Sequence, residues 1–282
     1  MREITVAEAI REALTEEMER DETVFVFGED VGIFGGDFGV TQGLYKKFPD
    51  RIIDTPIAEL GIMGIALGSA YSGMRPVPEI MFSDFTTVCF DYFVNQVSKN
   101  RYMSGMQEGG QDACVVIRTP NGAGIRAAAQ HSQCMEQFFM PVVGLKIALP
   151  STPYDTKGML KYALRGKDPV LFFEHKQLYG MKGPVPEDDY VVPLGDADIK
   201  REGTDVTVIA TQWMVHKALA AAETLAAEGI SVEVVDPRSI KPLDKKTLIE
   251  SVKKTKRVVL VNEAPKTGNI MAEIGLMIVE EA

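Results

Sequence analysis

Hydrophobic positions along this 282-residue chain follow two spacings that alternate from one segment to the next. From Val6 to Arg20, apolar residues recur every three or four positions, which predicts an amphipathic helix. Thr5 precedes this segment and Glu8 follows three residues later, a spacing typical of a capping box at a helix start. The next segment, Val24 to Phe27, is a short apolar run that stops at Gly28 and predicts a buried strand.

The same alternation continues through the next 150 residues or so. Further strands are predicted at Pro78 to Phe82, Ala113 to Arg118, Lys146 to Leu149 and Val170 to Glu174. Further helices are predicted at Gly61 to Ser72, Phe90 to Tyr102 and Tyr154 to Leu164. Strands that alternate with helices are the pattern of parallel strands joined by helical crossovers, so the sequence predicts an α/β fold.

The composition changes between Gly180 and Gly203, where prolines, glycines and acidic residues show no helical period. We interpret residues 183–203 as a linker between a first domain, residues 1–182, and a second α/β domain, residues 204–282. The second domain is predicted to contain strands at Asp205 to Ala210, Ser231 to Asp236 and Arg257 to Asn262, and helices at Val215 to Glu228, Asp244 to Lys254 and Ile270 to Ala282. With only three strands of its own, this domain is expected to be incomplete.

Charge and composition argue against several kinds of partner. Thirty Lys and Arg against forty Asp and Glu give a net charge of −10, and no basic run is long enough to bind a nucleic acid backbone. The apolar stretch from Leu60 to Ala70 is broken by glycines and is shorter than the ~18 residues of a membrane span. Acidic residues interrupt the first eight positions, where a signal peptide would be apolar. We therefore expect a cytoplasmic protein with no nucleic acid or membrane partner.

Two glycine-rich segments bear on nucleotide binding. Gly28 to Gly39 follows a predicted strand but contains neither G-x-G-x-x-G nor G-x-x-x-x-G-K-[ST]. Gly61 to Gly68 superficially resembles a dinucleotide fingerprint, yet its spacing suits a helix whose glycines allow close packing against a neighbour. A nicotinamide-binding oxidoreductase is therefore a disfavoured alternative.

Two side chains are candidates for chemistry. Glu59 lies just before a long apolar helical stretch, so its carboxylate is either functional or a first-turn residue favoured by the helix dipole. His131 lies among small residues that leave room for a ligand, and its ring can shuttle protons near neutral pH. The alternative is a structural histidine that is hydrogen-bonded inside a loop. No metal site is predicted, because the histidines and cysteines show no convincing ligand spacing.

Several short blocks carry a more specific signal when taken together. They are Gly28-Glu-Asp-Val-Gly32, Asp54-Thr-Pro-Ile-Ala-Glu59, Arg75-Pro76, His131-Ser-Gln133, Pro150-Ser-Thr-Pro-Tyr-Asp155, Asp236-Pro-Arg238 and Lys241-Pro-Leu-Asp244. In these blocks the chain resembles the β subunit of the thiamine-diphosphate-dependent E1 component of 2-oxo acid dehydrogenase complexes, of the acetoin or pyruvate dehydrogenase type. The resemblance extends from residue 1 to about residue 281. It implies a transketolase-like pyrimidine-binding domain followed by a smaller transketolase C-terminal-like domain for subunit association.

The resemblance also implies cofactor and partners. Thiamine diphosphate would be bound by its pyrimidine end, while an E1 α subunit would supply the diphosphate and Mg²⁺ site in an α2β2 heterotetramer. The G-D-G…N-N pattern of that site is absent from this sequence. The implied reaction cleaves a C–C bond beside a carbonyl of acetoin or a 2-oxo acid, and passes the fragment to lipoamide of the E2 dihydrolipoyl acyltransferase.

Four residues take roles from the resemblance. Glu59 matches the glutamate that hydrogen-bonds N1′ of the pyrimidine and promotes its imino tautomer. Phe85 matches the aromatic residue that packs on the pyrimidine ring, and Ile57 is expected to approach the same pocket. His131 matches the active-site histidine of this subunit, suited to steering the substrate carbonyl or the lipoyl group.

The sequence departs from the family pattern in three places. Pro141 stands near the position where a second histidine usually occurs, and Asn269 follows Gly268 where another glycine is usual. The family's closing strand and helix are not found. A non-catalytic scaffold or regulatory subunit of the same fold is therefore the alternative function. The segments from Arg126 to His131 and from Glu174 to Gly183 look most like acetoin dehydrogenase β subunits, with pyruvate second and branched-chain 2-oxo acids third.

Overall fold

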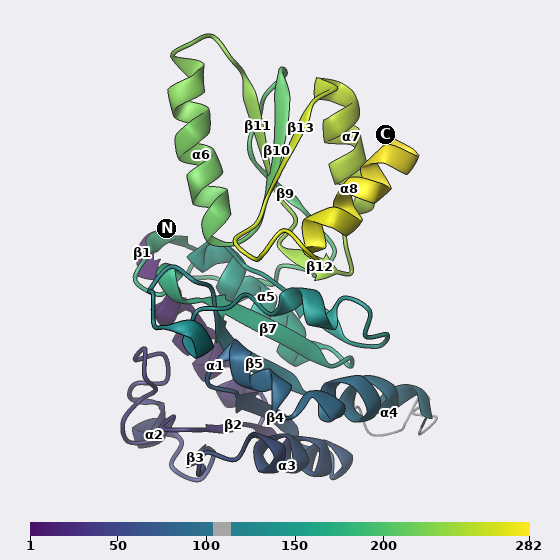
Figure 1. The fold of residues 1–282 in the computed structure, drawn as a ribbon. Coiled ribbons are helices and arrows are strands. Elements are labelled where there is room, and N and C mark those ends of the chain that lie inside the picture. The colour runs from purple at the N-terminus through teal and green to yellow at the C-terminus, as the bar shows by residue number, and fades with distance from the viewer. Residues whose placement is uncertain (104–113) are drawn as a thin grey trace.

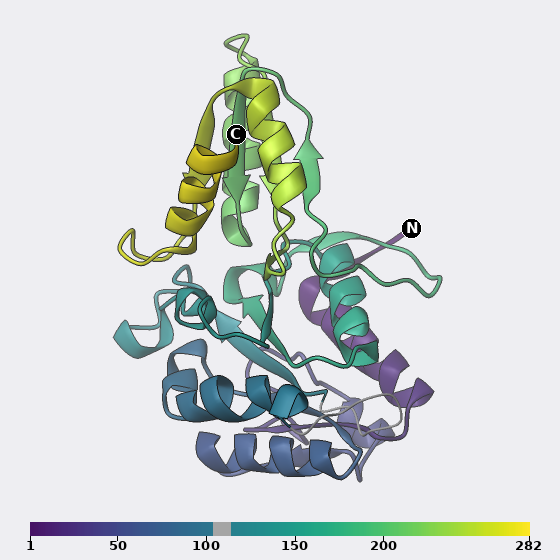
Figure 2. The same cartoon turned by 90° about the vertical axis from the view of Figure 1, so that its right-hand side faces the viewer.

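The computed structural model describes residues 1–103 and 114–282, and these residues form two α/β domains stacked one above the other (Figures 1 and 2). The strands of the first sheet are β2 (Val24–Gly28), β3 (Ile52–Asp54), β4 (Arg75–Glu79), β5 (Val116–Asn121), β6 (Lys146–Ala148), β7 (Val170–His175) and β12 (Ser239–Lys241). They are ordered β12-β6-β7-β5-β4-β2-β3, and all pairs are parallel except β12 with β6. The predicted α/β class is confirmed.

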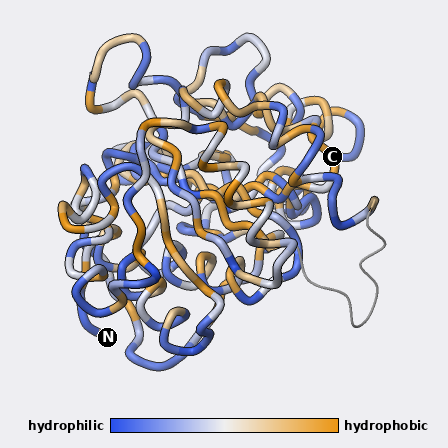
Figure 3. Tube along the Cα trace, turned by 90° about the horizontal axis from the view of Figure 1, so that it is seen from below, coloured by the Kyte–Doolittle hydropathy of each residue, from blue (hydrophilic) through white to orange (hydrophobic). Residues whose placement is uncertain are grey.

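Helices cover both faces of this sheet. On one face lie α1 (Val6–Arg20) and α5 (Pro153–Arg165), and on the other lie α3 (Glu59–Tyr71), the π-helical turn η2 (Tyr92–Val97) and α4 (Ser98–Met103). In β2, Val24 and Val26 pack in the core that contains α1, whereas Phe25 and Phe27 pack in the core that contains α3. A strand buried on both faces is apolar throughout, which explains why the sequence reads as a continuous run. Figure 3 shows hydrophobic segments running through the interior of the molecule.

The first helix begins as the sequence predicts. The Thr5 hydroxyl accepts a hydrogen bond from the Glu8 backbone N–H at 3.1 Å, and the Glu8 carboxylate accepts one from the Thr5 N–H at 2.7 Å. This reciprocal pair satisfies two of the backbone donors that a helix start leaves free. Short helical segments elsewhere are α2 (Leu44–Lys47), η1 (Ser83–Thr87), η3 (Ala129–His131), η4 (Glu136–Phe139) and η5 (Lys176–Leu178).

Two predicted strand boundaries were wrong. The strand predicted at 78–82 is β4 at Arg75–Glu79, and it contains Pro76 and Pro78 although it lies between β5 and β2. The Arg75 N–H donates to Thr23 on the β2 side, whereas the Ile80 N–H donates to Arg118 on the β5 side. Because successive residues point their N–H groups to opposite sides, both prolines turn the side that lacks a donor toward β5. The strand predicted at 113–118 is β5 at 116–121, and Ala113 lies outside the described residues.

The second domain has one more strand than predicted. Its sheet is ordered β13-β10-β11-β9, with β10 (Val206–Ala210), β11 (Val232–Asp236) and β13 (Val258–Val261) parallel and β9 (Asp198–Arg201) antiparallel. The segment interpreted as a linker thus supplies β9, and it also holds the end of β8 (Lys182–Val185), which pairs with β1 (Arg2–Thr5). Short polar strands such as β9 give no hydrophobic run, so the sequence pattern does not reveal them. Helix α6 (Trp213–Ala226) covers one face of this sheet, and α7 (Lys245–Thr255) and α8 (Ile270–Glu281) cover the other (Figure 1).

The two domains are connected at their junction by a strand and by ion pairs. Strand β12 comes from the second half of the chain but joins the first sheet beside β6. Asp155 at the start of α5 accepts hydrogen bonds from Lys200 at 2.5 Å and from Arg238 at 3.1 Å, and both donors belong to the second half. No helix in the described ranges 1–103 and 114–282 is long and apolar enough to cross a membrane.

A buried ion cluster ties three central strands together. Arg118 on β5 is fully buried and donates from Nη1 to Glu79 of β4 at 2.6 Å and from Nε and Nη2 to Glu174 of β7 at 2.6 and 2.9 Å. The Tyr179 hydroxyl donates a further bond to Glu174 at 2.8 Å. A buried guanidinium is tolerated because its charge is paired and its donors are bonded.

Replacing Arg118 with Met should destabilise the chain by about 3–5 kcal/mol, because two buried carboxylates lose their cation. Urea unfolding of the full chain measures this change. Arg2→Met is the matched control, since its pair with Glu12 is partly exposed and should contribute less than about 1 kcal/mol. Equal midpoints for the two variants would show that the cluster does not stabilise the fold.

Candidate active site

The candidate residues lie at one edge of the first sheet, where its parallel strands end. Glu29 follows β2, Glu59 follows β3, Phe85 follows β4, His131 follows β5 and Lys176 follows β7. These strands are neighbours in the order β7-β5-β4-β2-β3. The carboxyl ends of parallel strands are where open α/β sheets bind ligands, so the topology brings together residues that are far apart in the sequence.

Glu59 is the first residue of α3 and is only 8% exposed. It lies in the first turn of α3, as the helix-dipole interpretation expects. Its carboxylate also interacts electrostatically with the carboxyl group of Glu29. Burial, followed by repulsion from the Glu59 carboxylate, raises the pKa of Glu29 to about 7. The two carboxyl groups are therefore electrostatically coupled, and at neutral pH a proton resides on Glu29 for part of the time.

Two buried oxygen atoms at these strand ends have no hydrogen-bond partner within the described residues. They are Oε1 of Glu29 and Oγ1 of Thr55, which follows β3 directly. Buried polar atoms in folded proteins are almost always paired, so unpaired ones at a strand-end site indicate a group that binds there. A heteroaromatic ring with donor and acceptor nitrogens fits such a donor and acceptor set.

The thiol of Cys89 places Glu59 and Phe85 in one neighbourhood. Its sulfur lies 4.0 Å from the Phe85 carbonyl oxygen and 3.6 Å from that of Thr86. Burial, followed by the charge of Glu59, raises the pKa of this thiol to about 12. All three cysteines are buried.

His131 is held among aromatic rings. Its ring centroid lies 5.4 Å from that of Phe85 and 4.9 Å from that of Phe82, both edge to face. The Lys176 ammonium donates to the His131 carbonyl oxygen at 2.7 Å and lies 5.1 Å from the Phe82 ring centroid. The hydrogen bond that fixes this residue thus uses its backbone, while ring contacts orient its half-buried imidazole.

A cavity of about 490 Å³ continues from this loop to the second domain. It is lined by residues of the loop from Ala123 to Phe138 and by residues 263–265 and 267. Ser132 Oγ and Gln137 Oε1 are buried in its wall without a hydrogen-bond partner among the described residues. The site therefore has a polar continuation toward the domain junction.

The sequence predictions for the site have different outcomes. Phe85 and His131 do lie together, whereas Ile57 is 80% exposed ahead of α3 and its place in the pocket stays a prediction. Gly61 to Gly68 lie inside α3, as the packing interpretation predicts, and a Cβ on Gly64 would lie 3.0 Å from the Tyr92 hydroxyl. Glu29 and Lys176 were given no role from the sequence, although both stand in segments that carried the resemblance.

Comparison with known proteins agrees with this geometry. Residues 2–182 match the family model of the transketolase pyrimidine-binding domain, and residues 195–282 match that of the transketolase C-terminal domain. The chain superposes on a split-gene transketolase, described as an inactive beta4 tetramer, with a TM-score of 0.80 at 27% identity, covering 99% of this chain and 86% of that one. The two-domain transketolase-like fold is thereby confirmed.

Several named proteins are similar in sequence to this chain over nearly its whole length. Identity is 48% to the β subunit of acetoin:2,6-dichlorophenolindophenol oxidoreductase of Cupriavidus necator, over 100% of this chain and 85% of the relative. It is 50% to the 2-oxoisovalerate dehydrogenase β subunit of Bacillus subtilis, over 97% and 83%. It is 44% to the pyruvate dehydrogenase E1 β subunit of Staphylococcus epidermidis, over 100% and 86%. The chain therefore belongs to the family of E1 β subunits of thiamine-diphosphate-dependent dehydrogenases.

Proposed function

We propose that this chain is the β subunit of an E1 enzyme that cleaves the C–C bond beside a carbonyl of acetoin, or of a 2-oxo acid such as pyruvate, and passes the fragment to lipoamide of an E2 acyltransferase. The observation that carries the proposal is the buried Glu59 carboxyl at the sheet edge, beside the unpartnered oxygens of Glu29 and Thr55. The site thus offers proton-exchanging and hydrogen-bonding groups to a ring, as a pyrimidine requires.

Thiamine diphosphate, when bound, supplies the nucleophilic carbon that makes cleavage beside a carbonyl possible. In this chain Glu59 would exchange a proton with N1′ of the pyrimidine, and Phe85 would pack on the ring. Ile57 is proposed to approach the ring from the start of α3. His131 would orient the substrate carbonyl or the lipoyl group, since its imidazole is held in place by Phe82 and Phe85.

We assign the diphosphate and its Mg²⁺ to a partner α subunit in an α2β2 heterotetramer. The sequence lacks the G-D-G…N-N pattern, and the described residues contain no group of three or more His, Cys, Asp or Glu that could hold a metal ion. Large apolar side chains are exposed beside the site, with Ile33 82% and Phe34 68% exposed in the loop that follows Glu29. Leu60 and Ile65 of α3 are also exposed, so a partner that covers these residues would close the site over the pair Glu29 and Glu59.

The preference for acetoin rests on two segments, 126–131 and 174–183. Overall identity does not separate the substrates, because the acetoin, 2-oxoisovalerate and pyruvate relatives lie at 45–48%, 50% and 44–46%. The alternative function, a non-catalytic scaffold of the same fold, is favoured by none of the site contacts. Retention of Glu59, Phe85 and His131 argues against it.

Glu59→Gln should remove most activity of the enzyme reconstituted with its α subunit, by about 10²–10⁴-fold, because an amide cannot exchange a proton with N1′. Turnover is measured as reduction of 2,6-dichlorophenolindophenol in the presence of thiamine diphosphate and Mg²⁺. Circular dichroism and tetramer mass should match those of the wild type. Retention of more than half of the wild-type rate would refute the role of Glu59, and inactivity of the wild type itself would support the scaffold alternative.

The Glu29 carboxyl should titrate at about pH 7 in the full chain, as followed by ¹³C NMR of labelled glutamate. Glu59→Gln should lower this pKa, because it removes the repulsion, but burial should keep it above the ordinary value of 4.5. Since the folded-state pKa is raised, protonated Glu29 stabilises the fold fully below about pH 4.5, and this contribution is lost as the pH rises through 7. The exposed Glu19→Gln substitution is the control and should leave the Glu29 midpoint in place; the same midpoint in Glu59→Gln would contradict the coupling.

The reconstituted enzyme should reduce 2,6-dichlorophenolindophenol faster with acetoin than with pyruvate or a branched-chain 2-oxo acid. The comparison uses one enzyme preparation at saturating concentration of each substrate. Equal or faster turnover of pyruvate would overturn the substrate preference and leave the family assignment intact.

A further inference from the structure

A single carboxylate of the second domain holds both ends of the loop that carries His131. Glu263 follows β13, and its Oε2 atom accepts hydrogen bonds from three groups of the first domain. The donors are His175 Nε2 at 2.7 Å, the Ala123 backbone N–H at 3.1 Å and the Cys134 thiol at 3.7 Å. Ala123 and Cys134 flank the residues 124–133, so this oxygen joins the two ends of the loop.

The protonation states of Glu263 and Cys134 match the hydrogen bond between them, because Glu263 accepts it and Cys134 donates it. Burial alone would raise the pKa of Glu263, but the hydrogen bonds from His175, Ala123 and Cys134 lower it, so the group is an ionised acceptor at neutral pH. Burial, followed by the charges of Glu136 and Glu263, raises the pKa of the Cys134 thiol, which keeps its proton to donate. His175 is only 3% exposed, and its Nδ1 accepts from the Gln177 N–H at 3.2 Å, which leaves Nε2 as the donor to Glu263.

Inside the loop, Gln133 Nε2 donates to Asp84 Oδ1 at 2.7 Å, and the rings of Phe82 and Phe85 pack against His131. The Gly122 N–H donates to the Gln133 carbonyl at 3.3 Å and closes the neck of the loop. Gly122 has a φ of +97°, and a Cβ there would lie 2.3 Å from His175 Nε2, so this backbone runs directly against the imidazole that Glu263 holds. Residues 125, 126 and 128–130 are exposed. The position of His131 therefore depends on the anchors at the loop ends, on Lys176 and on the rings of Phe82 and Phe85.

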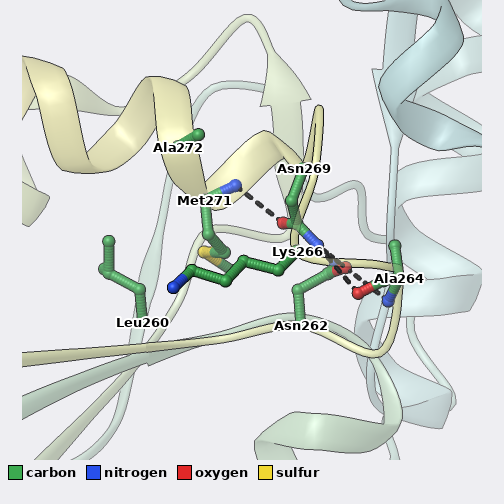
Figure 4. Close-up of a pocket in the computed structure, with 7 residues that line it drawn as sticks. All are labelled: Leu260, Asn262, Ala264, Lys266, Asn269, Met271 and Ala272. Atoms are coloured by element: carbon green, nitrogen blue, oxygen red, sulfur yellow. Dashed lines mark hydrogen bonds between the residues drawn. The ribbon is translucent and has the colours of Figure 1, made fainter.

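Glu263 is itself presented by a rigid turn. Asn269 caps α8 by accepting from the Met271 N–H at 2.9 Å, and its amide donates to Asn262 Oδ1 and Ala264 O at 3.0 and 3.1 Å (Figure 4). The same amide also donates to Pro265 O at 3.1 Å. Asn262 in turn donates to Glu136 at 3.1 Å. The residue that stands where the family usually has glycine thus fixes the turn on both sides of Glu263.

We propose that Glu263 is a positioning residue of the second domain, which sets the place of His131 by anchoring both ends of its loop. The role of His131 in turnover rests on the function proposed above, whereas the anchoring itself does not. Loss of the carboxylate leaves three first-domain donors without this acceptor and removes the link that the second domain makes to both loop ends. A displacement of about 1 Å in a catalytic group can cost about 10²-fold in rate.

The variants that test this are Glu263→Ala and Glu263→Gln, with Arg238→Gln as the matched control. Arg238 also joins the domains, through Asp155 at 3.1 Å, but the structure gives it no bond to the His131 loop. The chain has three histidines, so ¹³Cε1-histidine NMR of the full chain gives three resonances, and His131→Gln assigns that of His131. His216, which bonds to the Ser151 carbonyl at 2.8 Å, lies beside the Asp155 cluster and serves as the internal reference.

Glu263→Ala should shift or broaden the His131 and His175 resonances and leave that of His216 unchanged. Arg238→Gln should leave His131 unchanged, even where it lowers the melting temperature as much. Glu263→Gln should return the His131 resonance toward its wild-type position, because an amide oxygen can still accept from Ala123. In the reconstituted enzyme, kcat should fall by about 10–10²-fold in Glu263→Ala and by much less in Glu263→Gln and Arg238→Gln.

An unchanged His131 resonance in Glu263→Ala would overturn the proposal. So would equal losses of kcat in Glu263→Ala and Arg238→Gln, because they would show that Glu263 only docks the domains. A wild-type complex with no thiamine-dependent turnover would refute the proposed function and leave the NMR test of the anchor valid.

Discussion

The arrangement of the site depends on the buried guanidinium of Arg118. Its bonds to Glu79 and Glu174 join three neighbouring strands within a few residues of their carboxyl ends. The chain leaves these strands toward Phe82 and Phe85, toward His131 and toward Lys176. Because charges in this interior must stay paired, the strand ends cannot slide past one another, and the segments that follow them start from fixed positions. The prolines of β4 remove backbone donors on the β5 side, so the ion cluster supplies much of the connection there.

The site that follows these strands contains polar groups whose hydrogen-bonding capacity is not fully used. Glu29, Thr55, Ser132 and Gln137 each keep a buried oxygen without a partner among the described residues. Burial beside a second carboxylate raises the pKa of Glu29 to about 7, which makes the pair sensitive to protonation at neutral pH. Such groups cost stability in the single chain, and a bound ring and a covering subunit would both relieve that cost. The residues that stabilise the fold and the residues whose polar atoms are left unpaired thus lie in different parts of the same domain.

The second domain contributes to the site through its junction with the first domain. Strand β12 extends the first sheet, Lys200 and Arg238 bond to the start of α5, and Glu263 holds the His131 loop. Asp236 is buried in the same junction, and burial raises its pKa to about 6 although the Lys200 charge opposes this rise. Domain docking at α5 and the position of the His131 loop therefore depend on different charged groups of the second domain. This arrangement connects the smaller domain to the loop that carries His131 on the larger one.

The sequence by itself determined the elements whose signals are local. The helix from Val6 follows from apolar spacing and a capping box, the helix from Pro153 follows from apolar spacing, and β2 and β7 follow from apolar runs, because each signal lies within one segment. The family blocks also led to the prediction of Glu59, Phe85 and His131 as site residues, and the structure places Phe85 and His131 together. Only the tertiary structure decided the strand order, the entry of β9 and β12 into their sheets, the electrostatic coupling of Glu29 to Glu59, and the bonds of Glu263 to the His131 loop. These features join residues up to 140 positions apart, and their energy comes from pairing and burial between segments, which no pattern within one segment encodes.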